Sequence, residues 1–382
     1  MTAKRALHPR QGILDIAPYV PGKSTVAGGG PVIKLSSNET PFGPSPRAIE
    51  AYLKEAQTLS RYPNGSARPL REAIAKLYGL DPARIVCGAG SDELLSLLAT
   101  AYLGPGDEAI YSRHGFLVYR IVILARSATP VVAPEKNHTA DVDEILARVT
   151  PATRMVFLAN PNNPTGTYIT FDEVKRLRAG LPEDVVLVLD AAYAEYVRAN
   201  DYEAGIELVA TTHNTVMTRT FSKIYGLAGL RVGYGLAPAP IVTAIAKVRR
   251  AFDITTLAQE AALASLDSAQ ELERRRRSSA EGRVRLDGIL RDHGLAPVGP
   301  AVANFLFVEV GNDSRPFFEQ LLREGVIVRP THGFGAPGAV RVTVGTLRRK
   351  LTLDGEEPAL ETVIGRGYRL RELPASVEGV PA

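Results

Sequence analysis

The sequence has a single cysteine, Cys87, no tryptophan and only three methionines in 382 residues. One cysteine excludes an intrachain disulfide, and this usage is typical of a reducing compartment. Cys87 follows the apolar pair Ile85 and Val86, so we interpret it as a buried thiol rather than a nucleophile. No apolar run approaches the length that spans a bilayer, and residues 1–10 lack a signal-peptide core. We therefore expect a cytoplasmic protein with no membrane partner.

The chain also lacks a strong excess of either charge. Its 45 Lys+Arg residues face 41 Asp+Glu residues, which gives a net charge of +4. This balance does not favour a nucleic-acid partner, and the arginines at 274–277 are most simply a solvated helix face. The 45% hydrophobic and 23% charged content is ordinary for a globular protein, and 382 residues suffice for one large domain with a smaller partner.

Near-continuous apolar runs at 155–159 and 185–190 alternate with helical patterns between residues 68 and 240. Strands buried on both faces have this composition, and their alternation with helices predicts a mostly parallel sheet. Helical sequence then extends over 239–293, and 303–345 predicts a smaller α+β domain. Residues 1–35 are expected to be irregular, and a helix is expected from about Pro46.

The segment 218–234 contains a lysine, Lys223, among small and apolar residues. Such surroundings favour a neutral amine, which can form a Schiff base with an aldehyde. Thr220, Ser222 and Arg231 can bind an anion nearby. An aldehyde that carries a phosphate fits both groups, and pyridoxal 5'-phosphate is such a cofactor. By itself, however, a Ser-Lys pair is more often a surface feature of a glycine-rich loop.

Other polar residues follow predicted strands, where ligands of open α/β sheets bind. Gly90, Ser91 and Asp92 open a helix and can bind an anion, although a tight turn is the simpler interpretation. Asp190 ends a buried strand and can pair with a protonated pyridine nitrogen, or cap a helix. Tyr193 can hydrogen-bond to the ring oxygen of the same cofactor.

Three further kinds of residue suit such a site. Asn163, in the turn-rich segment 160–166, can offer its amide to the ring oxygen, and Phe116 can stack on the ring or pack in the core. Arg329 and Arg341 lie near predicted strand ends, and a planar guanidinium suits carboxylate or phosphate, although a lone arginine is usually on the surface. We name no metal ligands.

In this order and spacing, the motifs resemble those of the fold-type I pyridoxal-phosphate aminotransferases, over roughly residues 11–346. Arg231, eight positions after Lys223, matches as well. The resemblance implies an α/β fold with two parts: a large domain, whose mostly parallel seven-stranded sheet is flanked by helices, and a smaller α+β domain. We expect an N-terminal arm or small-domain segment at 1–45, the cofactor-binding domain at 46–280, the small domain at 281–346 and an atypical tail at 347–382.

The resemblance also implies the role of each residue. Lys223 would bond to the cofactor and move the reacting proton, while Asp190 would keep the pyridine nitrogen protonated. The remaining cofactor-binding residues would be Gly90, Ser91, Asp92, Phe116, Asn163, Tyr193, Thr220, Ser222 and Arg231, with Tyr62 donated by the second subunit of a homodimer.

Within the family, the chain is most similar to members that act on histidinol phosphate, through segments 18–23, 37–44, 61–63, 227–231 and 341–346. This implies exchange of an amino group between histidinol phosphate and 2-oxoglutarate, to give imidazole-acetol phosphate and glutamate, or the reverse. The substrate-binding residues would be Tyr19 and Arg329 for the phosphate, Arg341 for the carboxylate, and Asn38.

Two departures from the family pattern leave alternatives open. Residues 251–255 read Ala-Phe-Asp-Ile-Thr where members often have Pro-Phe-Asn-Val-Asn, and the tail resembles the end of a winged-helix regulator. An aromatic amino-acid aminotransferase and a lyase similar to threonine-phosphate decarboxylases are the alternative enzymes. A cofactor-responsive DNA-binding regulator is a third hypothesis.

Overall fold

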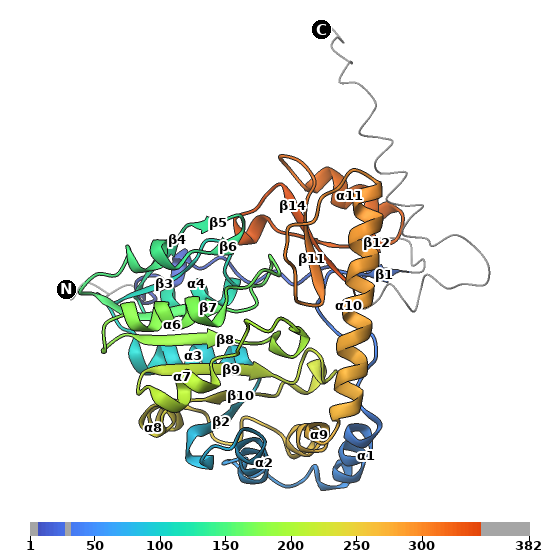
Figure 1. Ribbon diagram of the computed structural model, residues 1–382. Coiled ribbons are helices and arrows are strands. Elements are labelled where there is room, and N and C mark those ends of the chain that lie inside the picture. The colour runs from blue at the N-terminus through green and yellow to red at the C-terminus, as the bar shows by residue number, and fades with distance from the viewer. Residues whose placement is uncertain (1–6, 27–31, 345–382) are drawn as a thin grey trace, which may run out of the picture.

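The computed structural model describes residues 7–26 and 32–344 (Figure 1). The tail predicted at 347–382 lies outside the described residues. Within the described part, no helix is both long and apolar enough to cross a membrane.

A seven-stranded sheet in the order β2-β10-β9-β8-β7-β3-β4 forms the centre of the larger domain (Figure 1). β10 runs antiparallel to both of its neighbours, and the other pairs are parallel. The strands are β2 (Ile85–Gly88), β3 (Glu108–Ser112), β4 (Thr129–Ala133), β7 (Thr153–Ala159), β8 (Val186–Asp190), β9 (Thr215–Thr220) and β10 (Gly233–Leu236). The mostly parallel seven-stranded sheet expected from the sequence is confirmed.

Helices cover both faces of this sheet, which explains why its strands are apolar throughout. On β8, Leu187 and Leu189 belong to one core cluster, while Val186 and Val188 belong to another. The first cluster contains residues of α1 (Pro46–Glu55), α2 (Arg68–Tyr78), α5 (Val142–Leu146), α6 (Phe171–Gly180), α7 (Ile206–Thr211) and α9 (Thr256–Leu266). The second contains residues of α3 (Ser91–Tyr102), α4 (Leu117–Leu124) and α8 (Ala239–Val248).

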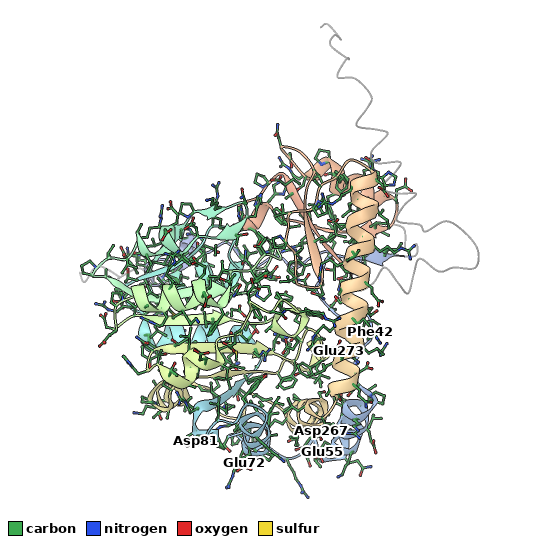
Figure 2. The ribbon with its side chains drawn as sticks, viewed as in Figure 1. Phe42, Glu55, Glu72, Asp81, Asp267 and Glu273 are labelled. Atoms are coloured by element: carbon green, nitrogen blue, oxygen red, sulfur yellow. The ribbon has the colours of Figure 1, made fainter. Side chains whose placement is uncertain are left out.

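The helical region expected at 239–293 is divided into α8, α9 and α10 (Ala269–Asp292). Phe252, with φ 57°, lies between α8 and α9, and the Thr255 side chain then caps α9 by accepting from the Ala258 amide. The long α10 runs alongside both domains in Figure 1. Phe42 lies beside this helix (Figure 2), with the Arg274 guanidinium 4.8 Å from its ring centroid.

The smaller α+β domain contains a three-stranded antiparallel sheet in the order β11-β14-β13, with α11 packed beside it. Its elements are β11 (Phe305–Glu309), α11 (Arg315–Arg323), β12 (Val326–Ile327), β13 (Arg329–Pro330) and β14 (Ala339–Thr343). The prediction that residues 1–35 are irregular is wrong at two places, because Ile13–Asp15 forms a 3-10 helix and β1 (Ile33–Lys34) pairs in parallel with β12. This pairing carries the segment after β1 from the small domain towards the large one.

The remaining regular elements are short. β5 (Glu135–Lys136) and β6 (Thr139–Ala140) form a separate antiparallel hairpin. The 3-10 helices are Ile13–Asp15, Ala56–Thr58, Pro82–Arg84, Ala194–Tyr196, Ala228–Leu230 and His332–Phe334.

Candidate active site

A cavity of about 610 Å³ lies where the carboxyl ends of β7, β8 and β9 meet residues of the small domain. Of the residues predicted from the sequence, the cavity is lined by Tyr19, Asn38, Ser91, Asp92, Phe116, Asn163, Asp190, Tyr193, Thr220, Ser222, Lys223, Arg231, Arg329 and Arg341. Gly90 and Tyr62 are outside this lining. The structure therefore brings almost the entire predicted set to one place.

Lys223 lies three residues after the end of β9, and the intervening Phe221 is fully buried. Its Nζ lies 5.6 Å from the centroid of the Tyr193 ring. The amine thus projects into the cavity that Asp190 also lines.

Asp190 is the last residue of β8 and is buried. The Tyr119 hydroxyl donates a 2.9 Å hydrogen bond to its Oδ2, and Thr218 Oγ1 lies 3.5 Å from its Oδ1. Burial raises the pKa of this carboxyl above its ordinary value, while hydrogen bonds from Tyr119 and the Ala192 amide oppose the shift. A cation placed against Asp190 would relieve this cost of burying a carboxylate.

Tyr119, on α4, is a residue that the sequence reasoning missed. Its ring stacks on Phe157 with centroids 5.0 Å apart and meets the ring of Phe116 edge-on at 6.0 Å. A signal was present, because residues three apart share one face of a helix and Phe116 stands directly before α4. Tyr119 therefore orients both the carboxylate and the aromatic wall of the cavity.

Tyr193 is held by a hydrogen-bond chain that begins in the small domain. Thr343 Oγ1 donates to Asn38 Oδ1 at 3.0 Å, and Asn38 Nδ2 donates to the Tyr193 hydroxyl at 2.7 Å. The ring of Phe305 meets that of Tyr193 edge-on at 5.1 Å. Asn38, expected to bind substrate, thus also fixes the position of Tyr193.

Arg341, on β14, reaches across to the large domain. It donates from Nη1 to Asn163 Oδ1 at 2.6 Å and from Nη2 to the Ser36 carbonyl at 2.8 Å. Its buried Nε has no hydrogen-bond partner, and no carboxylate in the described part of the chain forms an ion pair with it. Burial lowers the pKa of Arg341 to about 10, which still leaves the group charged at neutral pH. A buried cation without a counter-charge is suited to an anionic ligand.

At the other end of the cavity, four elements converge on a site for an anion. Arg231 Nη1 donates to Ser222 Oγ at 3.2 Å, and Nη2 donates to Asp92 Oδ1 at 2.9 Å. The Ser222 amide donates to Thr220 Oγ1 at 3.1 Å. α3 begins here with no side-chain cap, so its first amides are free to face an anion.

Two glycines permit this close approach. Gly90 has φ 93°, and a Cβ there would lie 2.6 Å from Arg231 Nη2. A Cβ on Gly233 would lie 2.5 Å from the Ser91 amide nitrogen. β10 begins only at Gly233, after Arg231 has turned through a left-handed conformation with φ 51°.

Tyr62 does not reach the cavity of its own chain. It is 83% exposed, and its ring stacks on Phe252 with centroids 4.8 Å apart. Tyr19 is half-exposed at the cavity entrance, where the Arg329 guanidinium lies 5.9 Å from its ring and donates to the Val20 carbonyl.

The donor set fits pyridoxal phosphate. The site offers an amine, a carboxylate whose burial favours a nearby cation, a tyrosine hydroxyl, and an uncapped helix start with an arginine and two hydroxyls. The carbonyl oxygen of Asn163 is already bonded to Arg341, so its amide nitrogen is free to donate in another direction. The amine suits the aldehyde of the cofactor, and the carboxylate suits its pyridine nitrogen. The tyrosine hydroxyl and the asparagine amide suit the ring oxygen, and the helix start with its arginine and hydroxyls suits the phosphate.

Comparisons with known proteins agree with this geometry. The family model described as aminotransferase class I and II matches residues 30–352. The chain is 57% identical to the histidinol-phosphate aminotransferase of Rhodopseudomonas palustris strain TIE-1 over 343 residues, which cover 88% of this chain and 94% of the relative. It is 52% identical to the enzyme of that name from Nitrobacter winogradskyi over 353 residues, or 91% and 96% of the two chains. The crystal structure of histidinol-phosphate aminotransferase from Sinorhizobium meliloti with pyridoxal-5'-phosphate matches with a TM-score of 0.85 and 27% identity, covering 97% of this chain and 99% of the other.

Proposed function

The chain belongs to the class I and II aminotransferase family, and we propose that it transfers an amino group between histidinol phosphate and 2-oxoglutarate. The products are imidazole-acetol phosphate and glutamate, and the reaction is reversible. The observation that carries this proposal is one cavity holding Lys223, Asp190 and the unpaired buried cation of Arg341, in a chain whose relatives bear this activity in their names.

The cofactor is pyridoxal phosphate, whose aldehyde accepts the amino group and whose pyridine ring withdraws electrons from the reacting carbon. We propose that Arg231, Ser222, Thr220 and the start of α3 hold its phosphate. Phe116 would stack on the ring, and Asn163 and Tyr193 would donate to the ring oxygen.

We propose Lys223 as the catalytic base, because its Nζ is the amine that projects into the cavity beside Tyr193. It would take the proton from the substrate carbon and deliver it to the cofactor carbon that carried the aldehyde. Asp190 would stay ionised against a protonated ring nitrogen, which would keep positive charge where electron density must be drawn. The hydroxyl of Tyr119 holds this carboxylate in place.

The two substrates differ in the charge they bring to the small-domain side of the cavity. Glutamate brings a carboxylate, which Arg341 can bind through the Nε that now lacks a partner. Histidinol phosphate has no carboxylate: a phosphorylated hydroxymethyl group takes its place, so its anionic charge lies farther from the carbon that bears the amino group. Arg329 and Tyr19, at the cavity entrance, are the proposed phosphate-binding residues.

We propose that the working unit is a homodimer, with Tyr62 of each chain completing the site of the other. Ile49, Leu53 and Leu59, which precede Tyr62 in the sequence, are exposed apolar residues, and the exposed Phe252 stacks on the Tyr62 ring. A second copy of the chain would cover these side chains. We propose the cytoplasm as the location of the enzyme, because its single cysteine is typical of a reducing compartment.

Half-reaction spectra on the cofactor-loaded enzyme test the substrate. Histidinol phosphate should convert the bound aldehyde with a higher kcat/KM than phenylalanine does, and Lys223→Ala should abolish turnover. Faster conversion by phenylalanine would favour the aromatic aminotransferase instead. Release of carbon dioxide from an amino-acid phosphate without any keto acid would favour the lyase.

A further inference from the structure

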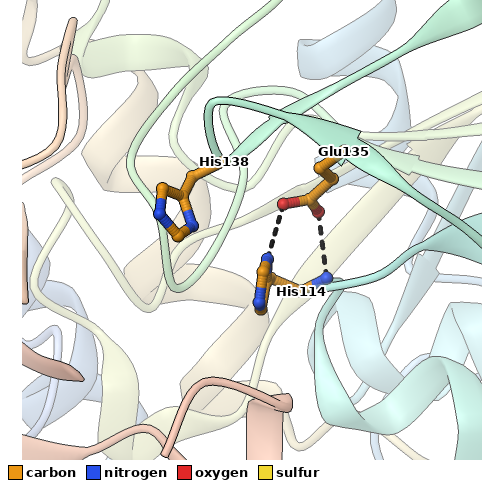
Figure 3. A group of neighbouring side chains, drawn as sticks. All are labelled: His114, Glu135 and His138. Carbon is orange, nitrogen blue, oxygen red and sulfur yellow. Dashed lines mark hydrogen bonds and ion pairs between the residues drawn. The ribbon is translucent and has the colours of Figure 1, made fainter. Parts of the chain in front are cut away.

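A second cluster of chemically active side chains lies outside the cavity. His114 follows β3, Glu135 begins the β5–β6 hairpin, and His138 occupies the turn of that hairpin. One ligand atom from each residue lies within 4.8 Å of the other two. Figure 3 shows the three side chains converging from the hairpin and the neighbouring loop.

Glu135 is already fixed in position by His114. Its Oε1 accepts a 2.9 Å hydrogen bond from the His114 amide, while its Oε2 lies 2.6 Å from His114 Nδ1. The His114 side chain is 10% exposed and that of Glu135 is 2% exposed. One carboxylate oxygen is therefore anchored to the backbone, and the other faces an imidazole nitrogen.

His138 presents an unsatisfied nitrogen to this pair. Its Nδ1 is buried and has no hydrogen-bond partner among the residues that the structure describes, while its Nε2 lies 3.2 Å from Glu309 Oε1 on β11. The carboxylate of Glu309 favours the tautomer with hydrogen on Nε2, which leaves a lone pair on Nδ1. The backbone of His138 is also fixed, because its carbonyl accepts from Thr167 Oγ1 at 2.7 Å.

We propose that His114, Glu135 and His138 form a binding site for a divalent d-block cation, of which Zn²⁺ is the one to test. Two imidazoles and one carboxylate are a ligand set that zinc takes in proteins, at about 2.0–2.2 Å from each donor. The three ligand atoms already lie within 4.8 Å of one another, so small side-chain rotations would bring them to that distance from a common point. A water molecule would complete the tetrahedron.

Glu309 would act on the metal through His138. A ligating histidine usually donates its second N–H to a carboxylate, and that partner fixes the ring and raises its basicity. The contact between His138 Nε2 and Glu309 has this form. Because Glu309 lies on β11 of the small domain, the cation would join the hairpin of the large domain to the small domain.

The cluster also adjoins the cofactor cavity. His114 stands two residues before Phe116, and its carbonyl accepts from Asn162 Nδ2 at 3.3 Å. A cation bound here would therefore stabilise the loops that carry Phe116 and Asn163. We expect zinc to raise the Tm of the holoenzyme by the ordinary linkage of binding to folding.

The test uses the full-length holoenzyme without an affinity tag, stripped of metals with a chelator and then titrated with Zn²⁺ against a competing indicator dye. We expect about one zinc per chain, confirmed by elemental analysis after desalting. His138→Gln and Glu135→Gln should weaken binding by about 100-fold or more, and Glu309→Gln should weaken it by about 10- to 100-fold. His332→Gln is the matched control, because His332 makes a similar contact with the Asp313 carboxylate on the surface and should leave zinc binding unchanged.

Substitution with Co²⁺ gives a second measurement that needs no variant. A tetrahedral site produces intense visible bands, whereas adventitious surface binding leaves the weak spectrum of octahedral cobalt. Binding of less than about 0.1 zinc per chain, equal binding by the His138→Gln variant, or an octahedral cobalt spectrum would each overturn the proposal. The hydrogen bonds of the cluster would then serve only to hold the β5–β6 hairpin in place.

Discussion

Tyr119→Phe removes one hydroxyl from the buried surroundings of Asp190 and leaves the aromatic contacts of the ring intact. The hydroxyl donates to Asp190 Oδ2 at 2.9 Å, and both side chains are buried. Phenylalanine keeps the stack on Phe157 and the edge-on contact with Phe116, because both involve only the ring. The substitution therefore isolates the hydrogen bond.

A hydrogen bond to a charged acceptor is worth about 1.5–3 kcal/mol. The bond favours the ionised carboxylate, so its loss raises the pKa of Asp190 further above its ordinary value. A more basic carboxylate draws the proton away from the pyridine nitrogen and weakens the electron withdrawal that catalysis needs. If about half of that energy is lost from the transition state, kcat should fall by about 4- to 12-fold.

Single-turnover half-reactions with glutamate, followed by the absorbance of the cofactor from pH 6 to 9, provide the assay. The matched control is Tyr111→Phe, since Tyr111 is a buried tyrosine whose ring centroid lies 6.3 Å from that of Tyr119. It does not contact Asp190, and it should leave the rate within about twofold of wild type. If Tyr119→Phe also stays within twofold at every pH, the argument that Tyr119 positions Asp190 is wrong.

Three further predictions concern the cavity and its supports. Arg341→Gln should raise the KM for glutamate by about 100-fold, because a charge-assisted bond is lost. Arg329→Gln should raise mainly the KM for histidinol phosphate. If each variant affects both substrates equally in half-reaction kinetics, the assignment is wrong. Gly233→Ala should cost about 1–3 kcal/mol, seen as a lower Tm, because the new Cβ would lie 2.5 Å from the Ser91 nitrogen at the start of α3. Gly288→Ala is the control: it has open space around it and lies inside α10, so it should raise the Tm slightly. A Tm that does not fall in Gly233→Ala would refute the clash. In the cofactor-free protein, burial raises the pKa of Asp190 above its unfolded value of 3.8. Between these two pKa values the native state binds more protons than the unfolded state, so the free energy of unfolding falls as the pH rises. Asp190→Asn should then be more stable than wild type at neutral pH, with the difference vanishing towards pH 4 in urea unfolding, and a difference independent of pH would rule this out.

The mostly parallel sheet and the positions of Lys223, Asp190 and Asn163 at its edge could be predicted from local sequence, whereas the number of seven strands came from the resemblance to the aminotransferases. A strand buried on both faces is an apolar run, and the first polar residues after it lie at the carboxyl edge of the sheet. Since the parallel strands share that edge, residues distant in sequence had to meet there. The structure places all three in the lining of one cavity.

Contacts that depend on the approach of separate elements could not be predicted in this way. Nothing local indicates that Asn38 meets Tyr193, because β1 has only two residues and its pairing with β12 sets where the segment goes. The meeting of His114 with His138 has the same cause, since the turn of the β5–β6 hairpin must fold back onto the loop that follows β3. Such contacts arise from tertiary packing and leave no periodic signal in the sequence.

Arg341 shows why the substrate and cofactor ends of the site cannot act independently. Its guanidinium bonds at once to the Ser36 carbonyl and to Asn163 Oδ1, and it retains a buried N–H with no partner. A carboxylate that binds to this group must share it with the asparagine proposed to hold the ring oxygen. The charge of the substrate is therefore transmitted through one side chain to the cofactor's hydrogen bonds. It follows that loss of Arg341 should lower kcat as well as raise KM, because Asn163 would lose the bond that orients its amide.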